Sequence, residues 1–383
     1  MNYSNDLYID FAPIDHGDIT GVARVALSLI HYANEFQDVF IIRNLEAFHR
    51  PNYIPEYFDV SIVSKDSLVF LKSFSATREH LKNLPTRRVL SNSLSSCKIL
   101  YPLWRPSKQI SKDEFLILYD FSTVRFSETH SPETVSRFSR NLEHAAQFST
   151  KCICISGTTK RDAIRYSSID PEDLEVIYCG LNPFLEINRT LAEDQNTRAR
   201  NFCKCLNFLF VSTLEPRKRI LETLRWWQQS SFNDGANHLT IVGGVAWWSP
   251  TQFLNELEKA RNSLEPNCVT FAGYIPEDVL KDYIDRASVL IYPSKYEGFG
   301  LPVQDALLMG TPVLASANSA LLEFESESIE FVNGENVEKW DVKLRKLLSG
   351  KETKSSSDLE AKYSWDGYLQ YIVNSKVKNN LLS

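Results

Sequence analysis

Short apolar runs alternate with longer amphipathic segments along the whole of this 383-residue chain. The runs have the length of strands, and the segments between them show the three- and four-residue spacing of helices. A strand, a helical crossover and a second strand form the βαβ unit, which builds parallel sheets with helices on both faces. The pattern therefore predicts an α/β protein with doubly wound sheets.

Two such arrays are separated by a polar, charged segment without an apolar face, LEINRTLAEDQNTRARN. The predicted strands are LYIDFAP, VFIIRN, VSIVSK, FLILYD and CICISG in the first array, with a helix from about Val22 to Asn34, and LNFLFVST, LTIVGG, CVTFAG, SVLIYPS and TPVLAS in the second. We expect a first domain over residues 1–185, a second over residues 186–365 and a final amphipathic helix over residues 366–383. KETKSSSD is expected to form a solvated loop before that helix.

Length and composition exclude several other classes of protein. A chain of this length can form two domains with sizeable cores, so it does not need disulfide bonds to hold it together. Its 42 Lys and Arg against 48 Asp and Glu give a net charge of −6, which provides no global attraction for nucleic acid. Seven cysteines without a CxxC pair fit a reducing compartment. Because the sequence shows neither a signal peptide nor an apolar stretch of membrane-spanning length, we expect a cytoplasmic protein.

Ligands of doubly wound sheets bind beyond the carboxyl ends of the strands, so the residues after each strand are the candidates. HGDITGVAR (residues 16–24) contains Gly21 in a turn that leads into a helix, where exposed amides can bind phosphate. An ordinary tight turn explains this stretch equally well. STLEPRKRI (residues 212–220) contains Arg217 and Lys218, which can neutralise a diphosphate, although paired basic residues are more often solvated.

The stretch YPSKYEGFGLPVQDALLMGTPVLAS is the most informative. After a strand that ends at Tyr292, Glu297 offers an acceptor for hydroxyl groups, and two glycines let backbone amides approach a ligand. Asp305 is expected in the first turn of the following helix, where it either contacts a ligand or only stabilises the helix dipole. Two carboxylates flanking an amide-rich loop suit a ligand that carries both sugar hydroxyls and phosphate.

The run Glu-Gly-Phe-Gly-Leu-Pro-Val-Gln-Asp-Ala, followed by Gly-Thr-Pro-Val, resembles the signature of retaining glycosyltransferases of family 4. The resemblance extends to TGVARVALSL, YDFSTVRFSETHSPETVSRF, ISGTTKRD, STLEPRK, AGYIPEDVL and the late YSW, and so covers nearly the whole chain. It implies the GT-B fold of two facing Rossmann-like domains, with the last helix crossing back to the first domain. It also implies transfer of a sugar from a nucleotide-sugar donor with retention at the anomeric carbon.

The resemblance assigns roles residue by residue. Glu297 corresponds to the first carboxylate of the family's Glu-x7-Glu motif, facing the donor sugar, and Asp305 replaces the second, which holds the ribose. Lys218 and Arg217 correspond to the basic pair on the donor diphosphate. The remaining donor-binding candidates are Gly21, Thr213, Tyr274, Ile275, Gly298, Phe299, Gly300, Leu301, Pro302 and Val303.

Two departures from the family pattern stand out. Many members have a Gly-Arg dipeptide where this chain has Ser212-Thr213, so one positive charge on the diphosphate is missing or is supplied by Arg217. Many also have a His that contacts the donor sugar where this chain has Tyr119. Asp120, which follows that tyrosine, is included among the catalytic candidates.

We expect no metal, because no Asp-x-Asp motif occurs in a matching context and no His or Cys cluster has ligand spacing. No cofactor is expected beyond the nucleotide-sugar substrate. The resemblance suggests a glycan or lipid-linked glycan acceptor in bacterial surface polysaccharide synthesis. A non-catalytic GT-B protein that binds a nucleotide or glycan, and a GT-B epimerase or phosphorylase, are the alternatives.

Basic residues of the first domain suggest weak contact with the inner face of an anionic membrane. The alternative is that they form an ordinary solvated face. These residues are Lys72, Arg78, Lys82, Arg87, Arg88, Arg105 and Lys108, with Tyr101 and Trp104 among them.

Overall fold

The computed structural model describes residues 6–15, 20–43, 56–68, 71, 73–183, 205–246, 249–265, 267–349 and 356–375. Two compact units divide the chain. The first comprises Met1–Val124, Pro132–Phe184 and Tyr363–Ser383, and the second comprises Arg125–Ser131 and Leu185–Lys362. The polar segment expected between the domains, at residues 185–201, lies outside the described residues.

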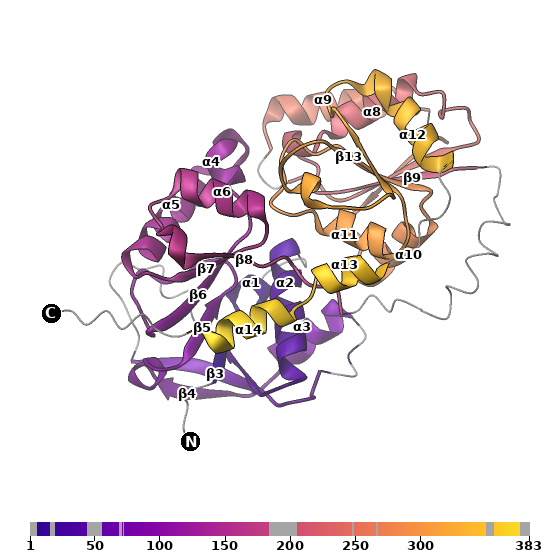
Figure 1. The fold of residues 1–383 in the computed structure, drawn as a ribbon. Coiled ribbons are helices and arrows are strands. Elements are labelled where there is room, and N and C mark those ends of the chain that lie inside the picture. Colours follow the sequence, from indigo (N-terminus) through magenta and orange to yellow (C-terminus); the bar gives the residue numbers. More distant parts are fainter. Residues whose placement is uncertain are drawn as a thin grey trace. The chain divides into compact units, whose positions relative to one another are not determined.

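Within its described residues, the first unit contains an eight-stranded sheet with the order β4-β3-β2-β1-β5-β6-β7-β8 (Figure 1). The strands are β1 (Leu7–Asp10), β2 (Val39–Ile42), β3 (Tyr57–Val63), β4 (Thr86–Leu90), β5 (Lys98–Tyr101), β6 (Asp113–Leu118), β7 (Lys151–Cys154) and β8 (Leu174–Val176). The prediction of a parallel sheet is wrong at one edge, because β3 pairs antiparallel with both β2 and β4. β4 is largely exposed, so it lacks the apolar run that would have marked it as a strand.

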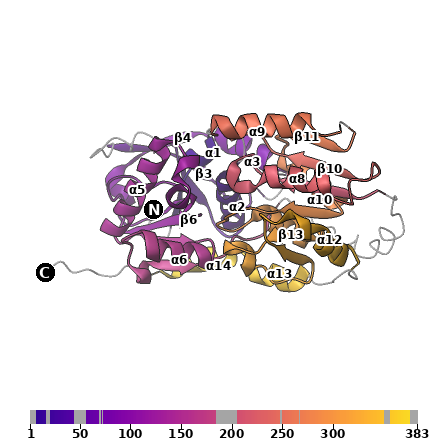
Figure 2. The ribbon, with the colours of Figure 1, turned by 90° about the horizontal axis from the view of Figure 1, so that it is seen from above.

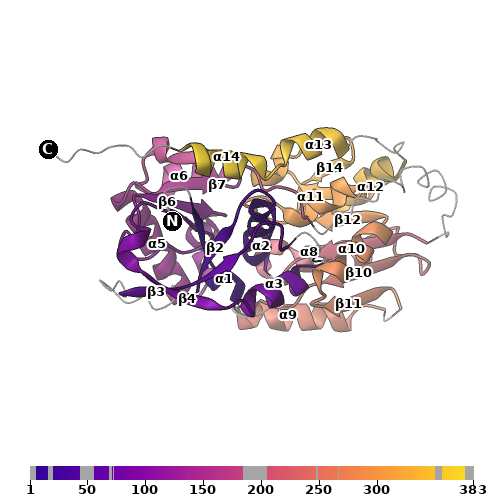
Figure 3. The ribbon, with the colours of Figure 1, turned by 90° about the horizontal axis from the view of Figure 1, so that it is seen from below.

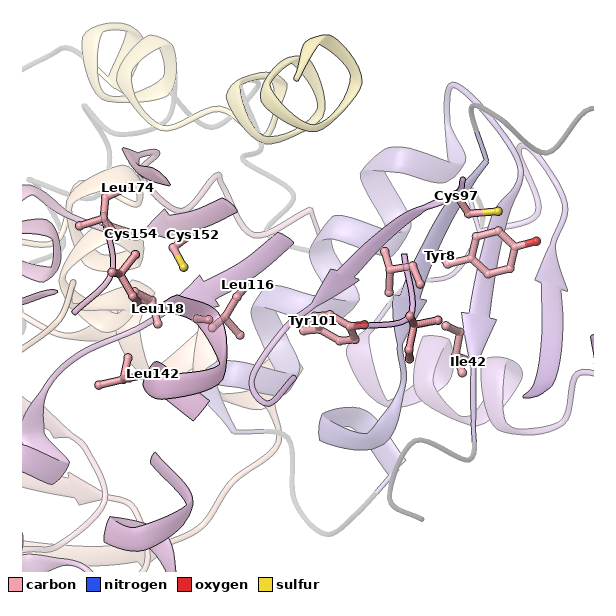
Figure 4. Close-up of a cluster of buried hydrophobic side chains, with 14 of the residues drawn as sticks. Tyr8, Ile42, Cys97, Tyr101, Leu116, Leu118, Leu142, Cys152, Cys154 and Leu174 are labelled. Atoms are coloured by element: carbon pink, nitrogen blue, oxygen red, sulfur yellow. The ribbon is translucent and has the colours of Figure 1, made fainter. Parts of the chain in front are cut away.

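The helices of this unit are α1 (Ala12–Asp15), α2 (Gly21–Asn34), α3 (Phe74–Lys82), α4 (Ser122–Arg125, which ends as the chain enters the second unit), α5 (Pro132–Gln147), α6 (Gly157–Tyr166) and α14 (Asp366–Asn374). One face of the sheet forms an apolar core with α5 and α6, in which strand residues such as Tyr8 and Leu116 are fully buried (Figure 4). Cys152 and Cys154 lie in this core. Cys205, in the second unit, is exposed.

The last helix, α14, packs within the first unit. The Trp365 indole nitrogen donates a hydrogen bond of 2.7 Å to the Leu181 carbonyl, and Tyr368 and Ile372 are buried. Lys98 at the start of β5 donates to the Ile372 carbonyl at 2.8 Å, near the helix C-terminus, where a cation is favourable. These contacts attach residues 363–375 to the same body as β5, although about 180 residues separate them from its other segments.

The described part of the second unit contains six parallel strands in the order β11-β10-β9-β12-β13-β14. They are β9 (Asn207–Val211), β10 (His238–Val242), β11 (Val269–Gly273), β12 (Val289–Tyr292), β13 (Val313–Ser316) and β14 (Ile329–Val332). Helices α8 (Ile220–Gln229), α9 (Thr251–Asn262) and α12 (Trp340–Ser349) cover one face, where α8 and α9 lie side by side (Figure 2). On the other face lie α10 (Glu277–Arg286) and α11 (Leu301–Leu308), with α13 (Ser356–Lys362) beside α11 (Figure 3).

One prediction about this unit needs correction. KETKSSSD was expected to be a loop, but α13 already begins at Ser356, while residues 351–355 lie outside the described residues. Leu359 of α13 is buried, so this short helix is stabilised by a tertiary contact. A polar sequence read locally does not show such a contact.

Candidate active site

The centre of the second sheet is a topological switch point. The order β11-β10-β9-β12-β13-β14 means that the chain leaves β9 toward one edge of the sheet and leaves β12 toward the other. Loops that diverge from neighbouring parallel strands leave room for a ligand at their carboxyl ends. The candidate segments 212–218 and 293–297 follow β9 and β12 directly.

At this point the fold brings Lys218 and Glu297 together. Lys218 Nζ lies 2.6 Å from Glu297 Oε1, and Arg217 Nη1 lies 3.7 Å from Glu297 Oε2. Arg217 also forms an ion pair of 2.6 Å with Glu215. All four side chains are largely buried, so water screens their interactions much less than those of surface pairs. Lys218 and Glu297 are thus each covered and partnered by the other.

Hydrogen bonds that involve backbone groups hold the two loops in place. Arg217 Nη1 donates to the Tyr296 carbonyl at 2.7 Å, and the Lys295 amide donates to the Arg217 carbonyl at 2.8 Å. The Glu297 amide donates to Ser319 Oγ at 2.9 Å. The positions of the charged groups are thus set by the protein itself, which is the condition for electrostatic preorganisation.

The two cations determine the charge of the carboxylate. Burial alone would raise the pKa of Glu297, but Lys218 and Arg217 outweigh burial and hold the pKa below its usual value. Glu297 is therefore ionised at neutral pH. Burial, and next the negative charge of Glu297, raise the pKa of the neighbouring Tyr292 hydroxyl well above its usual value, so this phenol stays protonated.

The glycine-rich loop that follows Glu297 ends at Gly300, which caps the start of α11. Gly300 has φ +115°, a conformation that side-chain-bearing residues rarely adopt, and an added Cβ would lie only 3.0 Å from a methyl group of Leu321. Asp305 is buried in the second turn of α11, not the first, so the interpretation as a helix-dipole residue does not hold.

Two residues from the segment Arg125–Ser131 contact this loop. The Arg125 guanidinium lies 4.5 Å from the centre of the Tyr296 ring, and the Phe126 ring lies 5.9 Å from it. Lys295 Nζ in turn lies 5.0 Å from the Phe126 ring centre. Tyr296 is fully buried beneath these groups, immediately before Glu297.

The other predicted residues lie apart from the charged cluster or belong to the first unit. Thr213 is exposed just after β9, while Tyr274, 47% exposed, and the half-buried Ile275 follow β11. In the first unit, Gly21 begins α2 and is exposed. Asp120 follows β6, and its Oδ1 accepts a hydrogen bond of 2.8 Å from the Ser122 amide.

Sequence reasoning missed Glu215, Tyr292 and Ser319. Glu215 could have been suspected because it lies two residues before Arg217 in the same loop. Tyr292 ends β12, the strand that leads to Glu297, whereas Ser319 follows β13 and meets Glu297 only through tertiary packing.

Within the described residues, a cavity, the metal-ligating side chains and the helix lengths were the remaining features that could indicate a second site. A cavity of about 360 Å³ lies between α10 and the first residues of β9, at the strand end opposite to Lys218. Among the described residues, no group of three or more His, Cys, Asp or Glu side chains could hold a metal ion. None of the helices within the described ranges is both long and apolar enough to cross a membrane.

Part of the sequence matches a known family. Residues 200–362 match the profile of the family described as Glycosyl transferases group 1. O-antigen chain mannosyltransferase B of Escherichia coli is 23% identical over 217 residues, which are 54% of this chain and 53% of that protein. O-antigen chain mannosyltransferase RfbU of Salmonella typhimurium is 22% identical over 265 residues, 69% of each protein. This chain thus spans only about half the length of the first of these relatives.

Solved structures resemble the whole chain. Sucrose-phosphate synthase of Thermosynechococcus elongatus has a TM-score of 0.65 and 17% identity, covering 96% of both chains. HepE of Anabaena, in complex with UDP and glucose, has a TM-score of 0.59 and 16% identity, covering 97% of this chain and 98% of its own. WaaG, a glycosyltransferase involved in lipopolysaccharide biosynthesis, has a TM-score of 0.53 and 14% identity, covering 97% and 96%. The chain therefore has the GT-B fold, and its residues 200–362 match the group 1 glycosyl transferases.

Proposed function

We propose that this protein is a retaining, metal-independent glycosyltransferase of family 4. It transfers a sugar from a nucleotide-sugar donor to a glycan or lipid-linked glycan in the synthesis of a bacterial surface polysaccharide. The observation that carries the proposal is the buried cluster of Lys218, Arg217 and Glu297 at the switch point of the second sheet. The match of residues 200–362 to group 1 glycosyl transferases supports the same conclusion.

The cluster suits the departure of a diphosphate. As the bond between the anomeric carbon and the donor phosphate oxygen breaks, negative charge collects on the leaving nucleoside diphosphate. Lys218 and Arg217 are already held in place by Glu297 and by backbone groups, so they stabilise this charge with little rearrangement. The acceptor oxygen bonds to the anomeric carbon on the same face, and its proton passes to a phosphate oxygen of the donor.

The remaining candidates are assigned to donor binding. Glu297 accepts hydrogen bonds from the donor sugar, and the amides beside Gly298 and Gly300 approach the donor closely. Asp305 holds the ribose, and Tyr274 with Ile275 contacts the base. The partial exposure of Tyr274 at the carboxyl end of β11 supports this last assignment.

The donor sugar proposed first is mannose, because two of the relatives are named as mannosyltransferases. A thermal-shift screen over GDP-, UDP-, ADP- and dTDP-sugars tests this proposal, with the largest stabilisation expected for GDP-mannose. Stabilisation by UDP-glucose alone would replace mannose by glucose, the sugar in the HepE complex. The anomeric configuration of the transfer product, determined by NMR, tests retention.

A non-catalytic GT-B binding protein is the second candidate, and one observation favours it. Lys218 and Glu297 neutralise each other at 2.6 Å, so the cation that would serve the diphosphate already has a partner. Hydrolysis of the donor without acceptor separates the two candidates. An enzyme releases nucleoside diphosphate slowly, whereas a binding protein leaves the donor intact over the same period.

The proposed acceptor side includes weak peripheral contact with an anionic membrane. Arg87 and Arg88 support this contact, because both are exposed on the edge strand β4. Arg105 and Tyr101, which were expected in the same basic patch, are buried and cannot contribute to it. Lys72 lies outside the described residues. Co-sedimentation with vesicles containing phosphatidylglycerol, compared with phosphatidylcholine alone, tests the contact, and Arg87→Gln/Arg88→Gln should weaken it.

A further inference from the structure

Arg219, the residue after Lys218, has an unusual backbone conformation. Its φ of +57° and ψ of +41° place it in the left-handed region, which non-glycine residues seldom occupy. It forms the junction between the short turn Pro216–Lys218 and helix α8, and its side chain is buried. A conformation of this kind persists only when surrounding contacts hold it.

Those contacts come from the ends of three neighbouring strands. Arg219 Nη1 donates to the Pro293 carbonyl, just after β12, at 3.3 Å and to Ser316 Oγ, at the end of β13, at 3.4 Å. Arg219 Nη2 donates to Glu335, shortly after β14, at 2.9 Å. One guanidinium thus links the loop after β9 to the carboxyl ends of β12, β13 and β14. Its planar, forked geometry allows several acceptors to be bound at once.

Gly334 provides the space for this side chain. A Cβ atom at position 334 would lie 2.2 Å from Arg219 Nη1 and 2.6 Å from Ser316 Oγ. It would also lie 2.8 Å from the Pro293 carbonyl, a backbone atom. Any side chain at position 334 would therefore displace the guanidinium from its acceptors.

We infer that Arg219 is a positioning residue for the proposed diphosphate site. By anchoring its side chain to the ends of β12, β13 and β14, it holds the turn at residue 219, and this turn fixes where Arg217 and Lys218 point. The inference rests on the proposed function, because it concerns how the same cations meet a diphosphate. The guanidinium N–H groups of Arg219 donate to protein acceptors, so Arg219 acts only by positioning Arg217 and Lys218.

Two substitutions disturb the contacts of the Arg219 guanidinium, one at Arg219 itself and one at Gly334. Arg219→Asn keeps a residue that tolerates the left-handed conformation but removes the guanidinium. Gly334→Ala keeps Arg219 but fills the space that its guanidinium occupies. Arg219→Lys keeps the charge without the fork, and Arg225→Asn removes an exposed arginine of α8 as a matched control.

The test compares binding of nucleoside diphosphates with binding of the corresponding nucleosides, using GDP, UDP, guanosine and uridine with the full chain. Calorimetry or ligand-observed NMR supplies the affinities. We expect Arg219→Asn and Gly334→Ala each to weaken diphosphate binding roughly tenfold or more, since small displacements of positioned charges have effects of this size. Nucleoside binding should stay unchanged, Arg219→Lys should lie between the wild type and Arg219→Asn, and the double variant should be no worse than either single variant.

Several outcomes would overturn the inference. Wild-type diphosphate affinity in Arg219→Asn, or an equal loss of nucleoside and diphosphate binding, would leave Arg219 with a structural role only. If Arg219→Asn does not fold, Gly334→Ala and Arg219→Lys carry the same comparison. A wild-type protein that binds none of GDP, UDP, ADP and dTDP would refute the proposed function, whereas normal wild-type binding with insensitive variants would refute only this inference.

Discussion

Each unit contains a buried ion pair with the same separation of 2.6 Å, and the two pairs have different surroundings. In the first unit, Arg105 Nη2 meets Glu114 Oε2. In the second, Lys218 Nζ meets Glu297 Oε1. Glu114 lies at the beginning of β6, whereas Lys218 and Glu297 follow the carboxyl ends of β9 and β12. Distance alone would not have distinguished a structural pair from a candidate site.

Hydrogen bonding to the carboxylates separates the two cases. Oε1 of Glu114 accepts hydrogen bonds from the Tyr101 hydroxyl at 3.0 Å, the Ile110 amide at 2.7 Å and the Ser111 amide at 3.1 Å. The chain thereby uses Glu114 to close the turn before β6. Glu297 is instead paired chiefly with the two cations Lys218 and Arg217, which a diphosphate could share. A carboxylate saturated by backbone amides indicates structure, and one balanced by cations at a switch point indicates binding.

The largest effect should follow from breaking the structural pair. Glu114→Ala leaves Arg105 as a buried charge without its carboxylate, and we expect the free energy of unfolding to fall by about 3–5 kcal/mol. Chemical denaturation of this variant and of Glu143→Ala, which changes an exposed glutamate of the same unit, supplies the measurement. Equal stabilities of the two variants would show that the Glu114 network is not structural.

Breaking the ion pair of Lys218 and Glu297 should mainly lower the rate of sugar transfer. Lys218→Met removes the charge but keeps much of the side-chain volume, and we expect kcat to fall about 10²–10³-fold, the usual cost of losing one transition-state donor. Some stability should be lost as well, since the variant leaves Glu297 with Arg217 as its remaining cationic partner. Activity and circular dichroism are measured together. A folded Lys218→Met variant with wild-type kcat would remove Lys218 from the site.

Lowering the pH should reduce the contribution of the Lys218–Glu297 ion pair to stability. Because the pKa of Glu297 in the folded protein lies below its ordinary value of 4.5, its ionised form stabilises the fold above pH 4.5, and this contribution is lost as the pH falls through the lower folded-state pKa. Each unit of depression corresponds to about 1.4 kcal/mol. The stability difference between wild type and Glu297→Gln should therefore shrink between pH 7 and pH 3.5. A difference that does not change with pH would contradict this assignment.

The smallest effect is expected from metal removal. If Lys218 and Arg217 neutralise the diphosphate, transfer should proceed at full rate in EDTA. The control is the same assay with added Mg²⁺ or Mn²⁺, which should not raise the rate. Activity that disappears in EDTA and returns with either ion would show that the cationic pair is not sufficient.

The sequence located much of the fold because its parallel strands are buried on both faces and appear as apolar runs. LTIVGG and SVLIYPS correspond to β10 and β12, and the polar segment after residue 184 coincides with the change of unit. The prediction missed β4, β5, β8 and β14. β4 is exposed at a sheet edge, β8 has only three residues, and β5 and β14 have four residues each. Their pairing depends on neighbouring strands that a local window does not contain.

For the candidate site, the sequence alone selected the residues that we propose: a basic pair after one strand, and a glutamate with glycines after another. Their residue types and their places beside strands were enough, because strand ends and glycine-rich turns have local signatures. Only the tertiary structure decided that Lys218 and Glu297, 79 positions apart, form an ion pair, and that Arg219 reaches three further strand ends. Burial, pKa and strain arise from what packs around a residue, and in this protein those neighbours come from distant parts of the chain.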